Sequence, residues 1–176
     1  MRRISAVVSA VLLAACTSPT LETEPAAPSS AQGGGGTGEQ RAAGVGDALV
    51  LRGNEEGLEM KIVLIEVVDP AKAADPFLAP AKGKRLVGVR LRLVNVGEAL
   101  YSDSPSNGAA LVDRDDHEYA ASPFDEVEPG LGSPKIAPGD SREGFITFVL
   151  PKGARPRLFQ LTLDSGFGPE TGQWEL

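Results

Sequence analysis

The sequence has a single cysteine and a single histidine in 176 residues, and aromatic residues make up only 5% of it. One cysteine cannot form a disulfide within the chain. Zinc sites usually combine several cysteine and histidine ligands, so these counts also argue against a zinc centre. After residue 16 no stretch is apolar over the ~20 residues that a spanning helix needs. The chain is therefore expected to be stabilised by an apolar core alone.

The longest apolar run lies at the start of the sequence. Arg2 and Arg3 are followed by the twelve uncharged residues 4–15, ISAVVSAVLLAA. As a helix this run would be roughly 18 Å long, which is short for a hydrocarbon core of ~30 Å. A basic patch, a short apolar run and small residues at its end are typical of a secretory signal peptide. General secretion is predicted over twin-arginine export, because nothing else of that signal follows the paired arginines.

The end of this run, LAAC at residues 13–16, resembles the lipobox of bacterial lipoproteins. The resemblance implies that a signal peptidase recognises Leu13, Ala14 and Ala15 and cuts before Cys16. It also implies a diacylglycerol on the Cys16 sulfur. Two acyl chains anchor a protein stably where one does so only marginally, since each buried CH₂ contributes ~0.8 kcal/mol. The expected partner is thus a membrane, at the outer face of the cytoplasmic membrane or at a periplasmic membrane face. The alternative is an ordinary signal peptide that happens to contain a cysteine.

Residues 17–46 differ in composition from a folded domain. Twenty-two of these thirty residues are Gly, Ala, Ser, Thr or Pro. Such a segment buries too little apolar surface to offset its chain entropy, so we expect a disordered tether. A flexible coil of this length has a mean span of about 30 Å. The sequence thus predicts a signal peptide at 1–15, the lipidated Cys16 with its tether at 16–46, and one domain at 47–176.

The domain shows the alternation of apolar and polar residues that is typical of β-strands. Runs at 58–68, 86–96, 144–150 and 158–163 place apolar residues on one face, and Gly- and Pro-rich turns separate them. The stretch 70–84, interrupted by Pro76 and Pro80, is expected to be a loop. Short strands with such turns predict an all-β fold, a sandwich or a barrel. The residues expected in the core are Leu58, Met60, Ile62, Leu64, Val87, Val89, Leu91, Leu93, Ile146, Phe148, Leu150, Phe159, Leu161 and Leu163.

Three segments of the domain carry a resemblance to a known family. They are LRLVNVGE at 91–98, LVDRDDHEY at 111–119 and IAPGDSREGFITFVLPKGA at 136–154. Residues 47–168 resemble the telokin-like, immunoglobulin-like domains of unknown function found in secreted bacterial proteins and lipoproteins. The resemblance implies an immunoglobulin-like β-sandwich and no assigned activity, and a fold does not fix a function. Asp116 stands where the family often has glycine in a hairpin turn, and aspartate tolerates left-handed backbone better than most residues.

His117 is the one candidate for a Ser-His-Asp catalytic arrangement. It lies in DRDDHEY, where the pattern predicts an exposed hairpin tip without an oxyanion hole or exclusion of water. No catalytic residue and no cofactor are predicted, and the chain is not expected to be an enzyme. The favoured function is a membrane-anchored surface lipoprotein whose domain binds an extracytoplasmic protein or ligand, or supports envelope assembly. A small accessory hydrolase is the alternative, and it would need His117 buried beside an aspartate and a serine.

Residues 113–128 hold seven acidic residues and a single basic one. Calcium prefers oxygen ligands at close spacing, and Asp113, Asp115 and Asp116 are the candidates for a weak calcium site. The segment lacks the glycine and the distant glutamate of a calcium-loop motif, however. It could also meet another charged partner, and a solvated loop is the favoured interpretation.

Basic residues gather at Lys82, Lys84, Arg85, Arg90 and Arg92. Arg90 and Arg92 share the polar face of one expected strand. They could meet an anionic polymer or lipid headgroups there, or pair with acids on the neighbouring strand. Without Arg2 and Arg3 the chain has 15 basic and 24 acidic residues. This balance argues against nucleic acid as a partner and against broad adhesion to anionic surfaces.

The few aromatic residues are expected in the core rather than on a ligand-binding surface. Phe145, Phe148, Phe159 and Tyr119 lie in or beside expected strands. Trp174 is expected to cap the edge of the sandwich, since a buried tryptophan contributes a large apolar surface. An exposed Trp174 would instead indicate a partner site.

Overall fold

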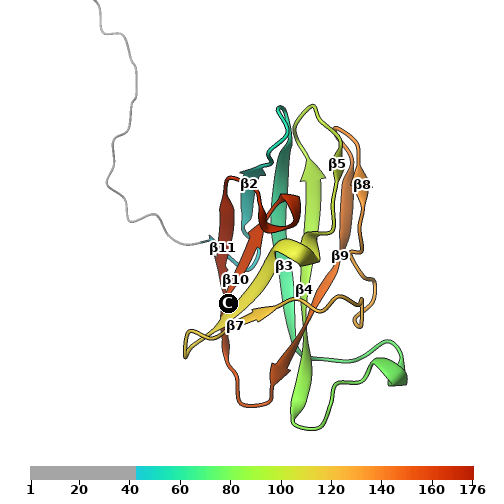
Figure 1. Cartoon of the computed structure of the whole chain (residues 1–176), viewed down its shortest axis with the longest axis vertical. Coiled ribbons are helices and arrows are strands. Elements are labelled where there is room, and N and C mark those ends of the chain that lie inside the picture. Colours follow the sequence, from blue (N-terminus) through green and yellow to red (C-terminus); the bar gives the residue numbers. More distant parts are fainter. Residues whose placement is uncertain (1–42) are drawn as a thin grey trace, which may run out of the picture. The chain divides into compact units, whose positions relative to one another are not determined.

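The computed structural model describes residues 43–176, and in these residues the predicted all-β, immunoglobulin-like sandwich is confirmed (Figure 1). One sheet has the order β2-β3-β4-β9 and the other β1-β11-β10-β6-β7, while β5 and β8 form a small third sheet. Three short 3-10 helices lie in the connections. The strands are β1 (Ala43–Gly44), β2 (Ala48–Arg52), β3 (Glu59–Ala71), β4 (Lys84–Asn95), β5 (Tyr101–Ser102), β6 (Ala109–Asp113), β7 (Glu118–Ala120), β8 (Lys135–Ile136), β9 (Ser141–Pro151), β10 (Pro156–Thr162) and β11 (Thr171–Glu175); the helices are η1 (Pro76–Leu78), η2 (Pro105–Gly108) and η3 (Asp164–Gly166).

The long strands β3 and β4 pair antiparallel and form the middle of the four-stranded sheet. Leu64 lies opposite Leu91, and Ile62 lies opposite Leu93. A strand points successive side chains to opposite faces, so this register sends both apolar rows to the interior. Every residue that the alternation predicted for the core is buried. The connection predicted at 70–84 is also present, although β3 extends to Ala71 and η1 forms within the loop.

Aromatic side chains join the two sheets. Phe148 of β9 meets Phe159 of β10 edge to face, with ring centroids 6.2 Å apart. Phe159 in turn contacts Trp174, with centroids 5.6 Å apart. Trp174 is fully buried, and its indole N–H donates to the carbonyl oxygen of Asp47 at 3.2 Å. The prediction that Trp174 caps the sandwich edge is thereby confirmed.

The sequence VNVG at 94–97 forms the turn after β4, and its Asn and Gly have specific roles there. The side-chain amide nitrogen of the buried Asn95, Nδ2, donates to the carbonyl oxygens of Ala99 and Ile136, at 2.7 and 2.9 Å. Its side-chain oxygen accepts from the Gly97 N–H at 3.1 Å. A Cβ on Gly97 would lie 2.2 Å from the carbonyl oxygen of Gly57, so only glycine fits there. Asn95 therefore links the β4–β5 connection to β8, and Gly97 lets this connection lie against the β2–β3 turn.

The folded part begins earlier than the sequence predicts. Ala43 and Gly44 lie in the segment expected to be a tether, yet they form β1, which pairs parallel with β11. The N–H of Gly46 also donates to the carbonyl oxygen of Leu64 at 2.7 Å. A two-residue edge strand is held by backbone groups, so it leaves no apolar pattern in the sequence. The predicted signal peptide, the LAAC segment with Cys16 and the rest of the tether lie outside the described residues. Among the residues described, no helix is long and apolar enough to cross a membrane.

Candidate functional site

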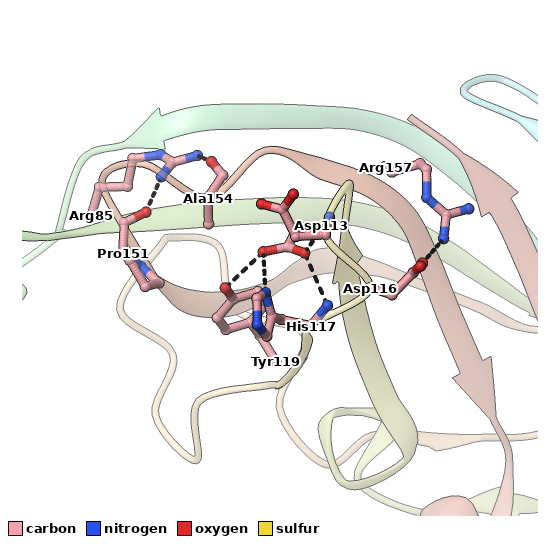
Figure 2. A network of polar contacts seen from close by, with 9 residues as sticks. Arg85, Asp113, Asp116, His117, Tyr119, Pro151, Ala154 and Arg157 are labelled. Atoms are coloured by element: carbon pink, nitrogen blue, oxygen red, sulfur yellow. Dashed lines mark hydrogen bonds and ion pairs between the residues drawn. The ribbon is translucent and has the colours of Figure 1, made fainter.

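The acidic hairpin joins β6 to β7 and carries most of the residues singled out from the sequence (Figure 2). Asp113 ends β6, and the N–H of Asp116 donates to its carbonyl oxygen at 3.2 Å to close the turn. Asp116 has φ 60°, the left-handed conformation expected at the position where the resembling family often has glycine. The hairpin predicted from LVDRDDHEY is therefore present.

The carboxylate of Asp113 organises this hairpin from inside. The residue is only 2% exposed. One carboxylate oxygen accepts from the N–H groups of Asp115 and His117, both at 2.9 Å, and the other accepts from the Tyr119 hydroxyl at 2.8 Å. Burial opposes ionisation, but these hydrogen bonds outweigh it and lower the pKa of Asp113. The same bond raises the pKa of Tyr119, because deprotonation would end its donation.

The interpretation of residues 113–128 as a solvated loop is thus wrong for Asp113, and it is also wrong for the buried Glu126. Glu126 accepts from the Ser122 hydroxyl at 2.5 Å. Asp115, Asp116 and Glu118 are exposed, as a solvated loop requires. The error arises because charge composition does not distinguish a carboxylate that caps its own turn from one that faces water.

The three candidate calcium ligands are not all brought together. Oxygen or nitrogen atoms of Asp113, Asp115 and His117 lie within 4.8 Å of one another. Asp116 points elsewhere and pairs with Arg157 at 2.7 Å (Figure 2). Both oxygens of Asp113 already accept hydrogen bonds from the protein. The Asp113 carboxylate therefore stabilises the hairpin turn, and its oxygens are not free to bind a cation.

His117 lies at the exposed tip of the hairpin, where the sequence places it. Its side chain is 70% exposed, and its Nδ1 lies 3.4 Å from the Asp113 carboxylate. The arrangement provides the aspartate of a catalytic triad, but the imidazole faces solvent rather than an enclosed site. General acid–base catalysis works best where water is excluded and the substrate is held in place.

The arginines of the basic group are used in ion pairs within the fold. Arg90 contacts Glu66 at 3.0 Å and Glu143 at 2.6 Å, and Arg92 contacts Glu143 at 2.9 Å. The predicted pairing with acids on neighbouring strands is thus confirmed for both. Arg85 donates to the carboxylate of Asp69. It also donates to the carbonyl oxygens of Pro151 and Ala154 (Figure 2). Lys82 and Lys84 remain exposed.

A second feature is a hollow on the outer face of the five-stranded sheet, here called the sheet hollow. It has a volume of about 410 Å³ and is lined from β6, β7, β10 and β11 together with η2 and η3. Small residues lie opposite one another at its floor, where Ala110 pairs with Ala120. Amides and hydroxyls surround them, and Glu118 is the one charged residue of the lining, which consists of Asn107, Gly108, Ala109, Ala110, Glu118, Ala120, Gln160, Thr162, Gly166, Thr171 and Gln173.

The helix η3 forms a rigid border of the sheet hollow. Asp164, Ser165 and Gly166 all have left-handed backbone, with φ of 54°, 55° and 92°. Such a conformation costs of order 1–3 kcal/mol for a non-glycine residue and persists only where its surroundings hold it. Here the N–H and hydroxyl of Ser165 both donate to the Asp103 carboxylate at 2.6 Å, and Asn107 donates to the Ser165 hydroxyl at 3.2 Å. No sequence pattern indicates this site, because its residues come from four strands that are distant in the chain.

Residues 58–171 match the family described as a domain of unknown function, DUF4352. The match spans more than half of the 176 residues. It agrees with the expected kind of domain, one without an assigned activity. No curated protein matches the chain.

Solved structures with the same fold come from bacteria. The secreted protein MPT63 of Mycobacterium tuberculosis has a TM-score of 0.56 and 13% identity, over 77% of this chain and 96% of MPT63. The yjhA protein of Bacillus subtilis has a TM-score of 0.53 and 12% identity, over 76% of this chain and 98% of its own. The ycdA protein of Bacillus subtilis, a candidate lipoprotein, has a TM-score of 0.52 and 16% identity, over 72% of this chain but only 38% of its own. At these identities the likeness establishes the fold.

Proposed function

The chain belongs to the family of the domain of unknown function DUF4352, and we propose that it is an exported, lipid-anchored binding module without catalytic activity. A signal peptide at 1–15 would direct export, and a diacylglycerol on Cys16 would hold the chain at a membrane surface. The sandwich would then present a binding surface to an extracytoplasmic protein or ligand. Solved relatives described as a secreted protein and as a candidate lipoprotein support this placement.

The observation that carries the binding role is the sheet hollow. The outer face of a sheet is normally covered by long charged side chains that keep it soluble. Here the floor is alanine and glycine, so a ligand could approach the sheet closely. The side-chain amides of Gln160 and Gln173 lie opposite each other on β10 and β11, and neither forms a hydrogen bond with another described residue. The Thr162 and Thr171 hydroxyls already bond each other at 2.7 Å, so the free groups of the lining are these two amides. Unpaired amides beside a small-residue floor suit an uncharged, hydrogen-bonding ligand.

The absence of catalysis is supported by the placement of His117. It is the only histidine of the chain, and it lies on the exposed β6–β7 hairpin rather than in the sheet hollow. Glu118 is the one ionisable side chain that lines the sheet hollow. Acid–base hydrolysis usually needs two groups with different protonation states on either side of the scissile bond.

The binding role can be tested by photo-crosslinking in the native membrane. A photoreactive side chain at Gln160 should give a defined adduct, whereas the same group at Val50, which is 54% exposed on the other sheet, should not. Replacing Ala110 by tryptophan would fill the sheet hollow and should abolish the Gln160 adduct, with folding checked by thermal melting. Equal adducts at both positions, or an adduct that survives Ala110→Trp, would contradict the proposed binding surface.

The anchor is tested separately by mass spectrometry of the amino-terminal peptide. The mature chain should begin at Cys16 and carry the mass of a diacylglycerol. The variant Cys16→Ala should lack this mass, and in a phase-partition assay it should move from the detergent phase to the aqueous phase. A mature chain that begins elsewhere, or a Cys16 with a free thiol, would refute the lipid anchor without bearing on the sheet hollow.

A further inference from the structure

The connection between β3 and β4, residues 72–83, presents an aromatic side chain to water in a fixed position. It lies at the lower right of Figure 1 and carries η1. Phe77 is 96% exposed and Leu78 is 37% exposed. The turn is ordered by hydrogen bonds, because the Asp75 carboxylate accepts from the Phe77 N–H at 2.8 Å and the Asp75 carbonyl accepts from the Leu78 N–H at 3.0 Å. The fold thus holds an apolar side chain outward instead of leaving it on a loose loop.

This segment is also attached to the body of the sandwich. The N–H of Ala74 donates to the carbonyl oxygen of Glu126 at 2.8 Å, and the N–H of Lys84 donates to that of Ala81 at 2.9 Å. Single exposed apolar residues are common on protein surfaces. An aromatic residue held clear of the surface at a rigid tip is less common, and such groups are typical of sites that bind another apolar surface.

Lysines surround this tip and are not neutralised by the fold. Lys72, Lys82 and Lys84 lie within thirteen residues, in which Asp75 is the one acid, and its carboxylate faces the turn backbone. Lys152 joins them, since its N–H donates to the carbonyl oxygen of Gly83 at 3.0 Å. Within residues 43–176 none of these four exposed lysines forms an ion pair. The chain as a whole carries a formal net charge of −7, so the tip is a local reversal of sign.

An apolar recess opens beside the lysines. It has a volume of about 460 Å³, and its lining includes Pro70, Ala71, Pro80 and Leu86, with Lys84 and Lys152 at the same opening. Arg85 also lines the recess, and its guanidinium is already bonded to Asp69 and to two backbone carbonyl oxygens. A recess of this kind combines an apolar interior with two free ammonium groups.

We propose that this tip docks onto the surface of an anionic lipid bilayer. Phe77 and Leu78 would enter the boundary between headgroups and acyl chains, while Lys72, Lys82, Lys84 and Lys152 would meet lipid phosphates. Aromatic and aliphatic residues flanked by lysines are the combination that binds to such interfaces, with each lysine adding an attraction that salt weakens. The negative charge elsewhere on the chain would be repelled by the anionic lipids, so the other faces of the domain would point away from the bilayer. Docking would thereby fix the orientation of the domain. The inference rests on the proposed anchor, which would keep the tip within reach of the bilayer.

The test uses the full lipoprotein reconstituted in vesicles. Cys16 is its single cysteine, and the lipid on the sulfur would block it, so an introduced cysteine would be the one thiol that takes a label. Phe77→Cys carries an environment-sensitive fluorophore, and brominated lipids serve as the quencher. The matched control is Phe167→Cys, which replaces another phenylalanine that is 83% exposed. Phe167 follows η3, after the end of β10. The segment that carries Phe77 contacts Lys152, which precedes the start of β10. The probes at positions 77 and 167 therefore lie near opposite ends of that strand.

Quenching at position 77 should exceed that at position 167 by at least about threefold in vesicles with anionic lipid. The difference should shrink in vesicles of zwitterionic lipid, in Lys82→Glu with Lys84→Glu, and at high salt, where the Debye length falls from ~10 Å at 0.1 M to ~3 Å at 1 M. Equal quenching at both positions, or quenching at 77 that ignores lipid charge, overturns the docking proposal. If the unaltered chain takes the label at Cys16, the anchor has failed, and flotation of that chain with anionic vesicles decides docking alone.

Discussion

Replacing Trp174 by alanine is expected to destabilise the folded domain by about 3–5 kcal/mol, the range for removing a buried tryptophan side chain. Trp174 is fully buried against Phe159 and donates its indole N–H to Asp47. Gly172 lies beneath the indole and has no side chain to fill the space, so the site cannot collapse and the upper half of the range applies. A domain of this size is typically stable by about 5–15 kcal/mol, so the melting temperature should fall by roughly 10–20 °C.

Urea unfolding followed by far-UV circular dichroism measures this loss, since Trp174 is the single tryptophan and the variant loses its fluorescence signal. Trp174→Phe keeps a ring against Phe159 but loses the indole donor, and it should cost about 1–2 kcal/mol. Phe167→Ala removes an exposed ring and should stay within about 0.5 kcal/mol of the unaltered protein. A loss below about 1 kcal/mol for Trp174→Ala, with an unchanged slope against urea, would refute the assignment of Trp174 to the core.

Further predictions concern the β4–β5 turn and the acidic hairpin. Asn95→Ala should cost about 2–4 kcal/mol in urea unfolding, because it leaves the carbonyl oxygens of Ala99 and Ile136 without their buried donor, and a loss under about 1 kcal/mol would contradict that role. Asp113→Asn should lower the melting temperature at neutral pH. Because the pKa of Asp113 is lowered in the folded state, its ionised carboxylate stabilises the fold above pH 3.8, and this stabilisation is lost as the pH falls through the folded-state pKa. The difference in melting temperature between Asp113→Asn and the unaltered protein should therefore close in acid. A difference that does not change with pH would argue against the ionised network. The melting temperature should be the same with calcium as with a chelator, because both oxygens of Asp113 already accept hydrogen bonds from the protein. A melting temperature several degrees higher with calcium would establish a calcium site.

The elements predicted well are those whose residues carry a local pattern. The alternation around Leu64 and Leu91 indicates which face is buried, because a strand repeats every two residues. The left-handed turn at Asp116 follows from the hairpin sequence in the same way. The sequence does not show which strand lies beside Arg90 and Arg92, so it does not decide between ion pairing within the sheet and binding of a partner.

The features that escaped prediction depend on contacts between distant segments. The strand β1 is held by backbone bonds to β11, so Ala43 and Gly44 look like tether residues in the sequence. The burial of Asp113 depends on Tyr119 and on the turn that closes over it. The sheet hollow requires Ala110, Gln160 and Gln173 to become neighbours, and this follows only from the strand order.

The pairing of β1 with β11 has a consequence for the timing of folding. Ala43 and Trp174 are partners although they come from the two ends of the folded part. Contacts between such distant residues form late, because the loop between them must close first. During synthesis, β1 has no partner until the final strand has been made, and the five-stranded sheet remains incomplete. The five-stranded sheet is therefore completed at its β1 edge only when the two ends of the folded part have come together.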